Sequence, residues 1–99
     1  MEKFVDYESF AAAKFKEDFE LCREMVINGI EEYYESGEDK DMTFIILNLG
    51  RIIKARGYKD FAQANLSDSQ IDSAIKDKEN YDRDAINKML KALGIKEQI

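Results

Sequence analysis

The side chains best suited to chemistry lie between residues 59 and 78. A run of hydroxyl, carboxylate and amide groups is formed by Ser67, Asp68, Ser69, Gln70 and Ser73. Groups of this kind hydrogen-bond to the edges of DNA bases when a helix presents them in the major groove. Three lysines flank the run and are candidates for contacts with phosphates: Lys59, Lys76 and Lys78. The alternative is a solvated polar surface with incidental lysines.

Most catalytic and metal-binding arrangements lack the residues they need. The 99 residues include no histidine and a single cysteine, Cys22. A His-based triad, a disulfide within the chain and a thiolate metal cluster are therefore excluded. Acidic neighbours such as Glu31 and Glu32 are expected by chance among 21 acidic residues, and nothing in the sequence desolvates them. We expect no enzyme, no metal site and no cofactor.

Length and composition indicate one soluble domain that spans residues 1–99. Apolar residues make up 44% and charged residues 36% of the chain, as in ordinary helical proteins. The longest apolar run, Phe44 to Leu47, is far too short to span a membrane. The first residues lack the apolar stretch of a signal peptide. We expect a cytoplasmic protein with no membrane partner.

The net charge of −6 is unevenly distributed along the chain. Residues 1–40 hold five basic and twelve acidic residues, a net charge of −7. Residues 41–99 hold ten basic and nine acidic residues, a net charge of +1. We expect an acidic N-terminal helical extension, residues 1–40, that does not contact DNA, and a core at 41–99. Because this core is nearly neutral, one protomer alone should bind DNA weakly.

Apolar spacing predicts five helices and no strand. The first carries a long stripe, interrupted by Gly29, which indicates a kink or a close helix crossing. The second spans about residues 42–56, and the last starts at a cap formed by Asp82 or Asp84. Residues 76–81 are expected to form a polar loop. The stripe of the first helix consists of Phe15, Phe19, Cys22, Val26, Ile30 and Tyr33, and helix ends are expected at Gly37, Gly57 and Gly94.

Residues 59–65 and 67–76 are predicted to form two short helices that cross steeply. Asn65 can adopt the left-handed conformation that ends a helix. Ser67 is a natural N-cap, and Gln70 completes a capping box. Two short helices joined by so few residues have the geometry of a helix-turn-helix, although small helical domains often contain such pairs. The apolar spacing of Ile71, Ala74 and Ile75 leaves outward Ser69, Asp72, Ser73 and Lys76.

Several ordered pieces of sequence occur between Tyr33 and Ile95, namely Gly37-Glu38-Asp39, Arg51 to Gly57, Phe61-Ala62, Leu66-Ser67 with Ile71 and Ala74-Ile75, and Met89 to Ile95. In this order they resemble the addiction-module antidote proteins, whose helix-turn-helix is of the lambda-repressor type. Two features differ from that family. Only three residues separate Ala62 from Leu66, where members usually carry four with a glycine last. Asp68 and Asp72 stand where basic or neutral side chains are common.

The resemblance implies an all-α, five-helix, lambda-repressor-like helix-turn-helix domain with a long N-terminal helix. It also implies a sequence-specific transcriptional regulator, the antitoxin of a toxin–antitoxin pair, that represses its own operon. The implied partners are a palindromic double-stranded DNA operator, a cognate toxin protein and a second copy of the chain. The alternative is a helical protein-interaction module that keeps the repressor-like fold and has lost DNA binding. The acidic character of Asp68 and Asp72 favours this alternative.

Overall fold

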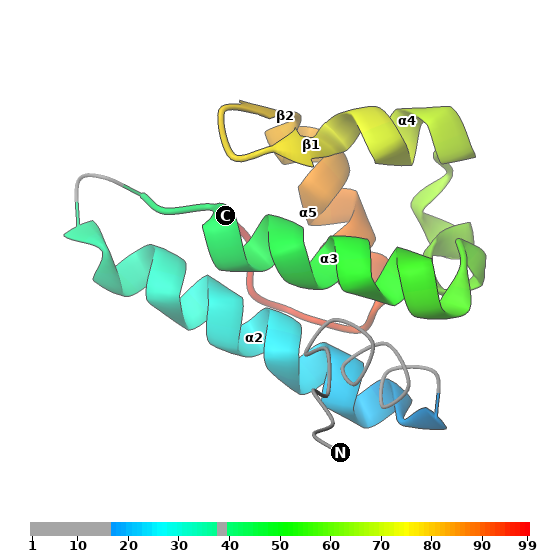
Figure 1. The fold of residues 1–99 in the computed structure, drawn as a ribbon, viewed down its shortest axis with the longest axis horizontal. Helices are drawn as coiled ribbons and strands as arrows, with labels where there is room; N and C mark the ends of the chain where they lie inside the picture. The colour runs from blue at the N-terminus through cyan, green and yellow to red at the C-terminus, as the bar shows by residue number, and fades with distance from the viewer. Residues whose placement is uncertain (1–16, 38–39) are drawn as a thin grey trace, which may run out of the picture.

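The computed structural model describes residues 17–37 and 40–99. Figure 1 shows α2 and α3 side by side, with α4 on the side of α3 that is opposite α2, and with α5 behind α3. The protein is mainly helical, as predicted, and each predicted helix has a counterpart. Phe15, at the start of the predicted apolar stripe, lies outside the described residues. The elements are α2 Phe19–Glu35, α3 Thr43–Arg56, the 3-10 helix η2 Lys59–Ala64, α4 Asp68–Ala74, β1 Ile75–Asp77, β2 Asn80–Tyr81 and α5 Arg83–Ala92.

The crossing of α2 and α3 is unusually close at Gly29, which is one of the two alternatives that the sequence left open. A Cβ at Gly29 would lie only 3.0 Å from the backbone nitrogen of Ile45. The amide of Asn48, a buried polar side chain of α3, donates to the carbonyl of Met25 on α2 at 3.0 Å. Glycine at this crossing therefore allows the two helix backbones to approach closely, and the Asn48 side chain bonds across it.

One core cluster joins the helices. The predicted stripe of α2 is buried from Cys22 onward, and the apolar faces of α3, α4 and α5 meet it. Tyr33 is buried while its neighbour Tyr34 is 52% exposed, so one ring belongs to the core and the other lies at its edge. The largest fully buried side chains are Phe61, Ile30, Met42, Ile45, Leu49, Ile52, Ile71, Ile86, Met89, Leu90 and Leu93.

The helix-turn-helix region departs from the prediction in its first element. Residues 59–64 form a short 3-10 helix, η2, which packs mainly on α5. Asn65 ends it in the left-handed conformation, with φ 59° and ψ 39°, as expected. The second helix was predicted to run to residue 76 but ends at Ala74. Packing thus places η2 and α4 against α5 and the shared core, and the lambda-repressor-like arrangement stays a prediction.

Residues 75–81 form a β-hairpin, so the prediction of no strand and of a polar loop at 76–81 was wrong. Ile75 pairs with Tyr81 and Asp77 with Asn80 in an antiparallel sheet of two strands. The side chain of Asp77 closes the turn, because its Oδ1 accepts the backbone N–H groups of Glu79 at 2.8 Å and Asn80 at 2.7 Å. These bonds lower the pKa of Asp77. The Asp77 side chain therefore stabilises the hairpin turn, although the segment lacks the alternation of apolar and polar residues that is typical of strands.

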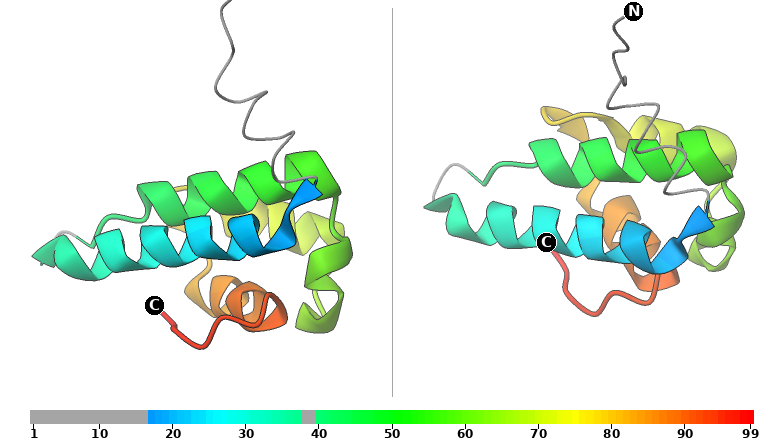
Figure 2. Two further views of the ribbon diagram at one scale, coloured as in Figure 1. Left: turned by 90° about the horizontal axis from the view of Figure 1, so that it is seen from below. Right: turned by 60° about the horizontal axis from the view of Figure 1, so that its bottom comes forward.

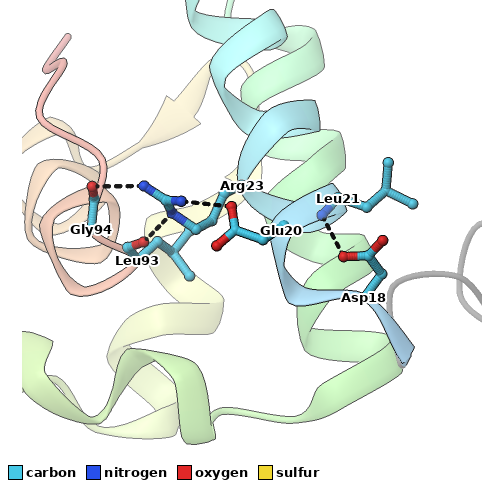
Figure 3. Close-up of polar contacts among 6 residues, drawn as sticks. All are labelled: Asp18, Glu20, Leu21, Arg23, Leu93 and Gly94. Atoms are coloured by element: carbon cyan, nitrogen blue, oxygen red, sulfur yellow. Dashed lines mark hydrogen bonds and ion pairs between the residues drawn. The ribbon is translucent and has the colours of Figure 1, made fainter.

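Arg23 fastens the end of α5 to α2, as Figure 3 shows. Its Nε donates to the carbonyl of Leu93 at 2.8 Å, and its Nη2 donates to the carbonyl of Gly94 at 3.1 Å. Glu20 accepts from Nη1 at 2.9 Å and orients the guanidinium. A cation at the end of a helix pairs with the unsatisfied carbonyls there.

After α5 the chain turns back along α2, as both views in Figure 2 show. Asn87 holds this segment through two hydrogen bonds with the backbone of Ile99. The hydroxyl of Tyr34 donates to the carbonyl of Gln98. Ile95, within this segment, is buried. Helix α2 is therefore packed along α3 on one side and bonded to Leu93, Gly94 and Gln98 on another, while its acidic side chains stay exposed.

Candidate nucleic-acid interface

The start of α4 is fixed by a complete capping box. Ser67 Oγ accepts the backbone N–H of Gln70 at 3.1 Å, and Gln70 Oε1 accepts the backbone N–H of Ser67 at 2.8 Å. Ile71 and Ala74 form the buried face of α4 and fix its orientation on the core. The four residues predicted to face outward are all exposed, namely Ser69, Asp72, Ser73 and Lys76, and Asp68 and Gln70 at the helix start are exposed as well.

Three of the predicted site residues line one groove. Ser69, Gln70 and Ser73 face β2 and the start of α5 across a hollow of about 610 Å³. The opposite wall carries two acidic side chains, Glu79 and Asp82. The groove offers hydroxyls and amides to a ligand, but its net charge repels a phosphate. All eight predicted residues are exposed: Ser67, Asp68, Ser69, Gln70, Ser73, Lys76, Lys59 and Lys78.

Gln70 is less free than a base-reading glutamine needs to be. Paired recognition of adenine requires the side-chain oxygen to accept from N6 while the amide donates to N7. In α4 that oxygen accepts the N–H of Ser67 instead. Gln70 can therefore offer its NH₂ group while the helix stays capped, and the hydroxyls of Ser69 and Ser73 are exposed beside it.

Asp72 is held by Tyr58, a contact that sequence reasoning did not identify. The Tyr58 hydroxyl donates to the two carboxylate oxygens of Asp72 at 2.8 and 2.9 Å. The carboxylate raises the pKa of Tyr58 by accepting this hydrogen bond. No local sequence pattern pairs Tyr58 with Asp72, because the two residues are fourteen positions apart. The bond fixes one negative charge on the outer face of α4.

The predicted lysines do not gather around α4. Lys78 lies beside Asp41 and Met42 at the start of α3, and it also lines a hollow with Leu47. Lys59 and Lys76 are exposed in η2 and β1. The structure therefore separates Lys78 from the groove of α4, and it does not assemble the three into one cluster with Ser69 and Ser73.

Two lysines that sequence reasoning missed lie beside the turn that precedes α4. Lys88 and Lys91 of α5 line a hollow of about 280 Å³ together with Gln63 and Asn65 of the η2 turn. The only sequence signal was their spacing of three on the polar face of the last helix. Two cations and two amides in one hollow form a suitable environment for a phosphate.

Other chemistry finds little support among residues 17–37 and 40–99. Burial raises the pKa of the Cys22 thiol from 9.0 to about 11, which makes it a poor nucleophile. Within those ranges no three acidic, cysteine or histidine side chains are grouped to hold a metal ion. No described helix is both long enough and apolar enough to cross a membrane.

Comparisons of the chain with protein-family models, with curated proteins and with solved structures found no match.

Proposed function

We propose that the protein is a sequence-specific DNA-binding regulator of the antidote type, which represses its own operon and binds a cognate toxin. The observation that carries the proposal is the capped helix α4. It follows a left-handed turn at Asn65, buries Ile71 and Ala74, and exposes Ser69 and Ser73. This is the form in which a recognition helix reaches base edges.

Contacts with phosphates are assigned in this proposal to both sides of α4. Lys88 and Lys91, with Gln63 and Asn65, lie next to the turn before the helix. Lys76 follows it in β1. Asp68 and Asp72 weaken the attraction of these cations for the phosphates, so the DNA affinity of one protomer is modest at physiological salt. Two protomers on a palindromic operator are therefore needed for stable binding.

The toxin contact is assigned to the acidic face of α2. Glu24, Glu31 and Glu35 are exposed along this helix. A face of one charge attracts a basic partner and repels DNA. The two proposed partners therefore bind different parts of the chain.

The alternative function is a helical protein-interaction module without DNA binding. The specific observation in its favour is the acidity of α4, where Asp68 is exposed and Asp72 is fixed by Tyr58. An acidic helix with a polar groove suits a peptide as well as a base pair. DNA titration distinguishes the two functions.

The test is a gel-shift and fluorescence-anisotropy titration of DNA from upstream of the gene, against a shuffled duplex, at several salt concentrations. Ser69→Ala and Ser73→Ala are expected to reduce the preference for the upstream DNA. Lys88→Ala and Lys91→Ala are each expected to lower the slope of log K against log salt by about one, because each removes one phosphate contact. Lys96→Ala, in the segment after α5, is the matched control and should change nothing.

A charge-removing variant gives a second and independent readout. Asp68→Asn should strengthen DNA binding about three- to five-fold at low salt, since it removes a negative charge beside the phosphates. Glu97→Gln, an exposed acid after α5, is its control. Equal affinity for upstream and shuffled DNA, together with no response to Asp68→Asn, would leave the protein-interaction module as the better account.

A further inference from the structure

The outer face of α3 exposes apolar side chains that the chain itself does not cover. Among the described residues the exposed large apolar side chains are Tyr34, Phe44 and Leu47, and the last two are 45% and 37% exposed. Tyr34 has partners within the chain, because its ring meets Tyr33 edge-on and its hydroxyl bonds to Gln98. Phe44 and Leu47 lie one turn apart on one helix and so form a continuous surface.

Two shallow hollows border this surface. One of about 330 Å³ lies between α2 and α3, where Met25, Gly29 and Phe44 form an apolar floor. Another of about 200 Å³ lies beside Leu47 and Ile46 and is almost entirely apolar. A projecting helix flanked by hollows is shaped to interlock with a second helical surface.

Gly50 adds an observation that exposure alone does not provide. It stands one turn after Leu47, near the middle of α3, where glycine destabilises a helix relative to alanine. Its backbone is helical, and a Cβ there would meet nothing within 4 Å. Gly29, by contrast, is required by the α2–α3 crossing. The chain gives no reason for glycine at 50, but the close approach of another backbone would.

The charges at the two ends of the face are opposite. Glu32 lines the hollow beside Phe44, and Lys54 is exposed one turn beyond Gly50. Along α3, Lys54 lies about 6 Å after Gly50 and Phe44 about 9 Å before it. A two-fold axis at Gly50, perpendicular to the helix, brings Lys54 of one copy to within about 3 Å, along the helix, of the Phe44 and Glu32 end of the other. The face is thus complementary to itself.

We propose that the outer face of α3 is a homodimer interface, in which α3 packs antiparallel on α3 of a second copy and the two helices cross at Gly50. Phe44 and Leu47 fill the hollows of the other copy, and Lys54 meets its Glu32. The interface does not depend on DNA binding, so its failure and the failure of the proposed function are separate results.

The test is sedimentation equilibrium of the full chain over a range of concentrations. The wild type should show a reversible monomer–dimer equilibrium. Leu47→Glu should weaken dimerisation at least about thirty-fold, because it places a charge at the centre of the interface. Ala62→Glu, at an exposed apolar position in η2, is the matched control and should dimerise as the wild type does. Circular dichroism checks that both variants fold.

Gly50→Ala distinguishes an interface from an accidental glycine. In dilute solution, where the chain is monomeric, its melting temperature should rise by about 4–8 °C, since alanine favours the helix. At high concentration its dimer should be weaker than that of the wild type, because the new methyl group separates the helices. A glycine with no partner predicts only the first effect.

Charge reversal tests the antiparallel orientation. Glu32→Lys and Lys54→Glu should each weaken the dimer up to about five-fold, and the double variant should recover most of this loss. Within one chain Glu32 lies at the Phe44 end of the face, and Lys54 lies ten residues farther along α3, about 15 Å, beyond the screening length of about 8 Å. Coupling between the two charges therefore reports a contact between copies. A monomeric wild type, a Leu47→Glu variant that dimerises normally, or charge reversals without recovery would overturn the proposal.

Discussion

Replacing Gly29 by alanine should destabilise the protein even though alanine is the better helix former. The added Cβ would lie 3.0 Å from Ile45 N, 3.1 Å from Phe44 C and 3.3 Å from Ile45 Cα. All three atoms belong to the backbone of α3, so no side chain can rotate away. Ordinary contacts of a Cβ begin near 3.4 Å, and α2 and α3 must therefore separate by several tenths of an ångström.

The expected magnitude combines two costs and one gain in the free energy of unfolding. Overfilling a packed contact costs about 1–3 kcal/mol. Alanine offsets about 1 kcal/mol of this through its higher helix propensity. Separation also stretches the bond from Asn48 to the carbonyl of Met25, which contributes about 1 kcal/mol. We expect a net loss of about 1–3 kcal/mol in the free energy of unfolding, which lowers the melting temperature by roughly 4–24 °C.

The assay is urea unfolding followed by circular dichroism, with the slope against urea checked for constancy between variants. Gly50→Ala is the matched control in dilute solution, because a Cβ there meets nothing and should stabilise the monomer by up to about 1 kcal/mol. If Gly29→Ala unfolds at the same urea concentration as the wild type or a higher one, the close crossing does not constrain this position and the reasoning fails.

Three further predictions concern stability. Asp60→Ala should lower the free energy of unfolding by about 2–3 kcal/mol, because Asp60 bonds to Arg56 at 2.6 and 3.2 Å and both side chains are largely buried. A loss below roughly 0.5 kcal/mol, the usual range of surface substitutions, would contradict a buried pair. Ser67→Ala should cost about 1 kcal/mol in thermal unfolding through the loss of the cap on Gln70, whereas a neutral result would contradict the capping box. The raised pKa of Cys22, about 11 against 9.0, means that the unfolded chain ionises first as pH rises. Stability should therefore fall between pH 9 and 11, by up to about 3 kcal/mol more than in Cys22→Ala, and parallel pH profiles would refute this assignment.

Local signals in the sequence predicted the ends of the helices well. Asn65 ends η2 in the left-handed conformation, and Ser67 with Gln70 starts α4, because these effects involve only neighbouring residues. Gly37, Gly57 and Gly94 all have positive φ, as expected of helix ends. For Gly29 the sequence left open a kink or a close helix crossing, and the structure shows the close crossing.

The hairpin escaped prediction because its pattern is not apolar. Only Ile75 and Tyr81 could have suggested strands, and the turn between them depends on bonds to the Asp77 side chain. The candidate site was predicted only in part, because some of its residues come together only in the folded chain. The exposure of Ser69 and Ser73 follows from the period of α4, whereas the placement of Lys88 beside Asn65 requires the tertiary fold. DNA binding and toxin binding stay predictions.

The hydrogen bonds of Arg23 connect residues that a ribosome makes far apart in time. Leu93 and Gly94 follow Arg23 by 70 and 71 positions, which corresponds to roughly 4–14 s of synthesis. During that interval α2 and α3 can already pair, but their core side chains still lack the buried residues that α5 contributes, such as Met89 and Leu90. The nascent chain thus presents an apolar surface that only the completed protein hides, and cellular chaperones or proteases have those seconds in which to engage it.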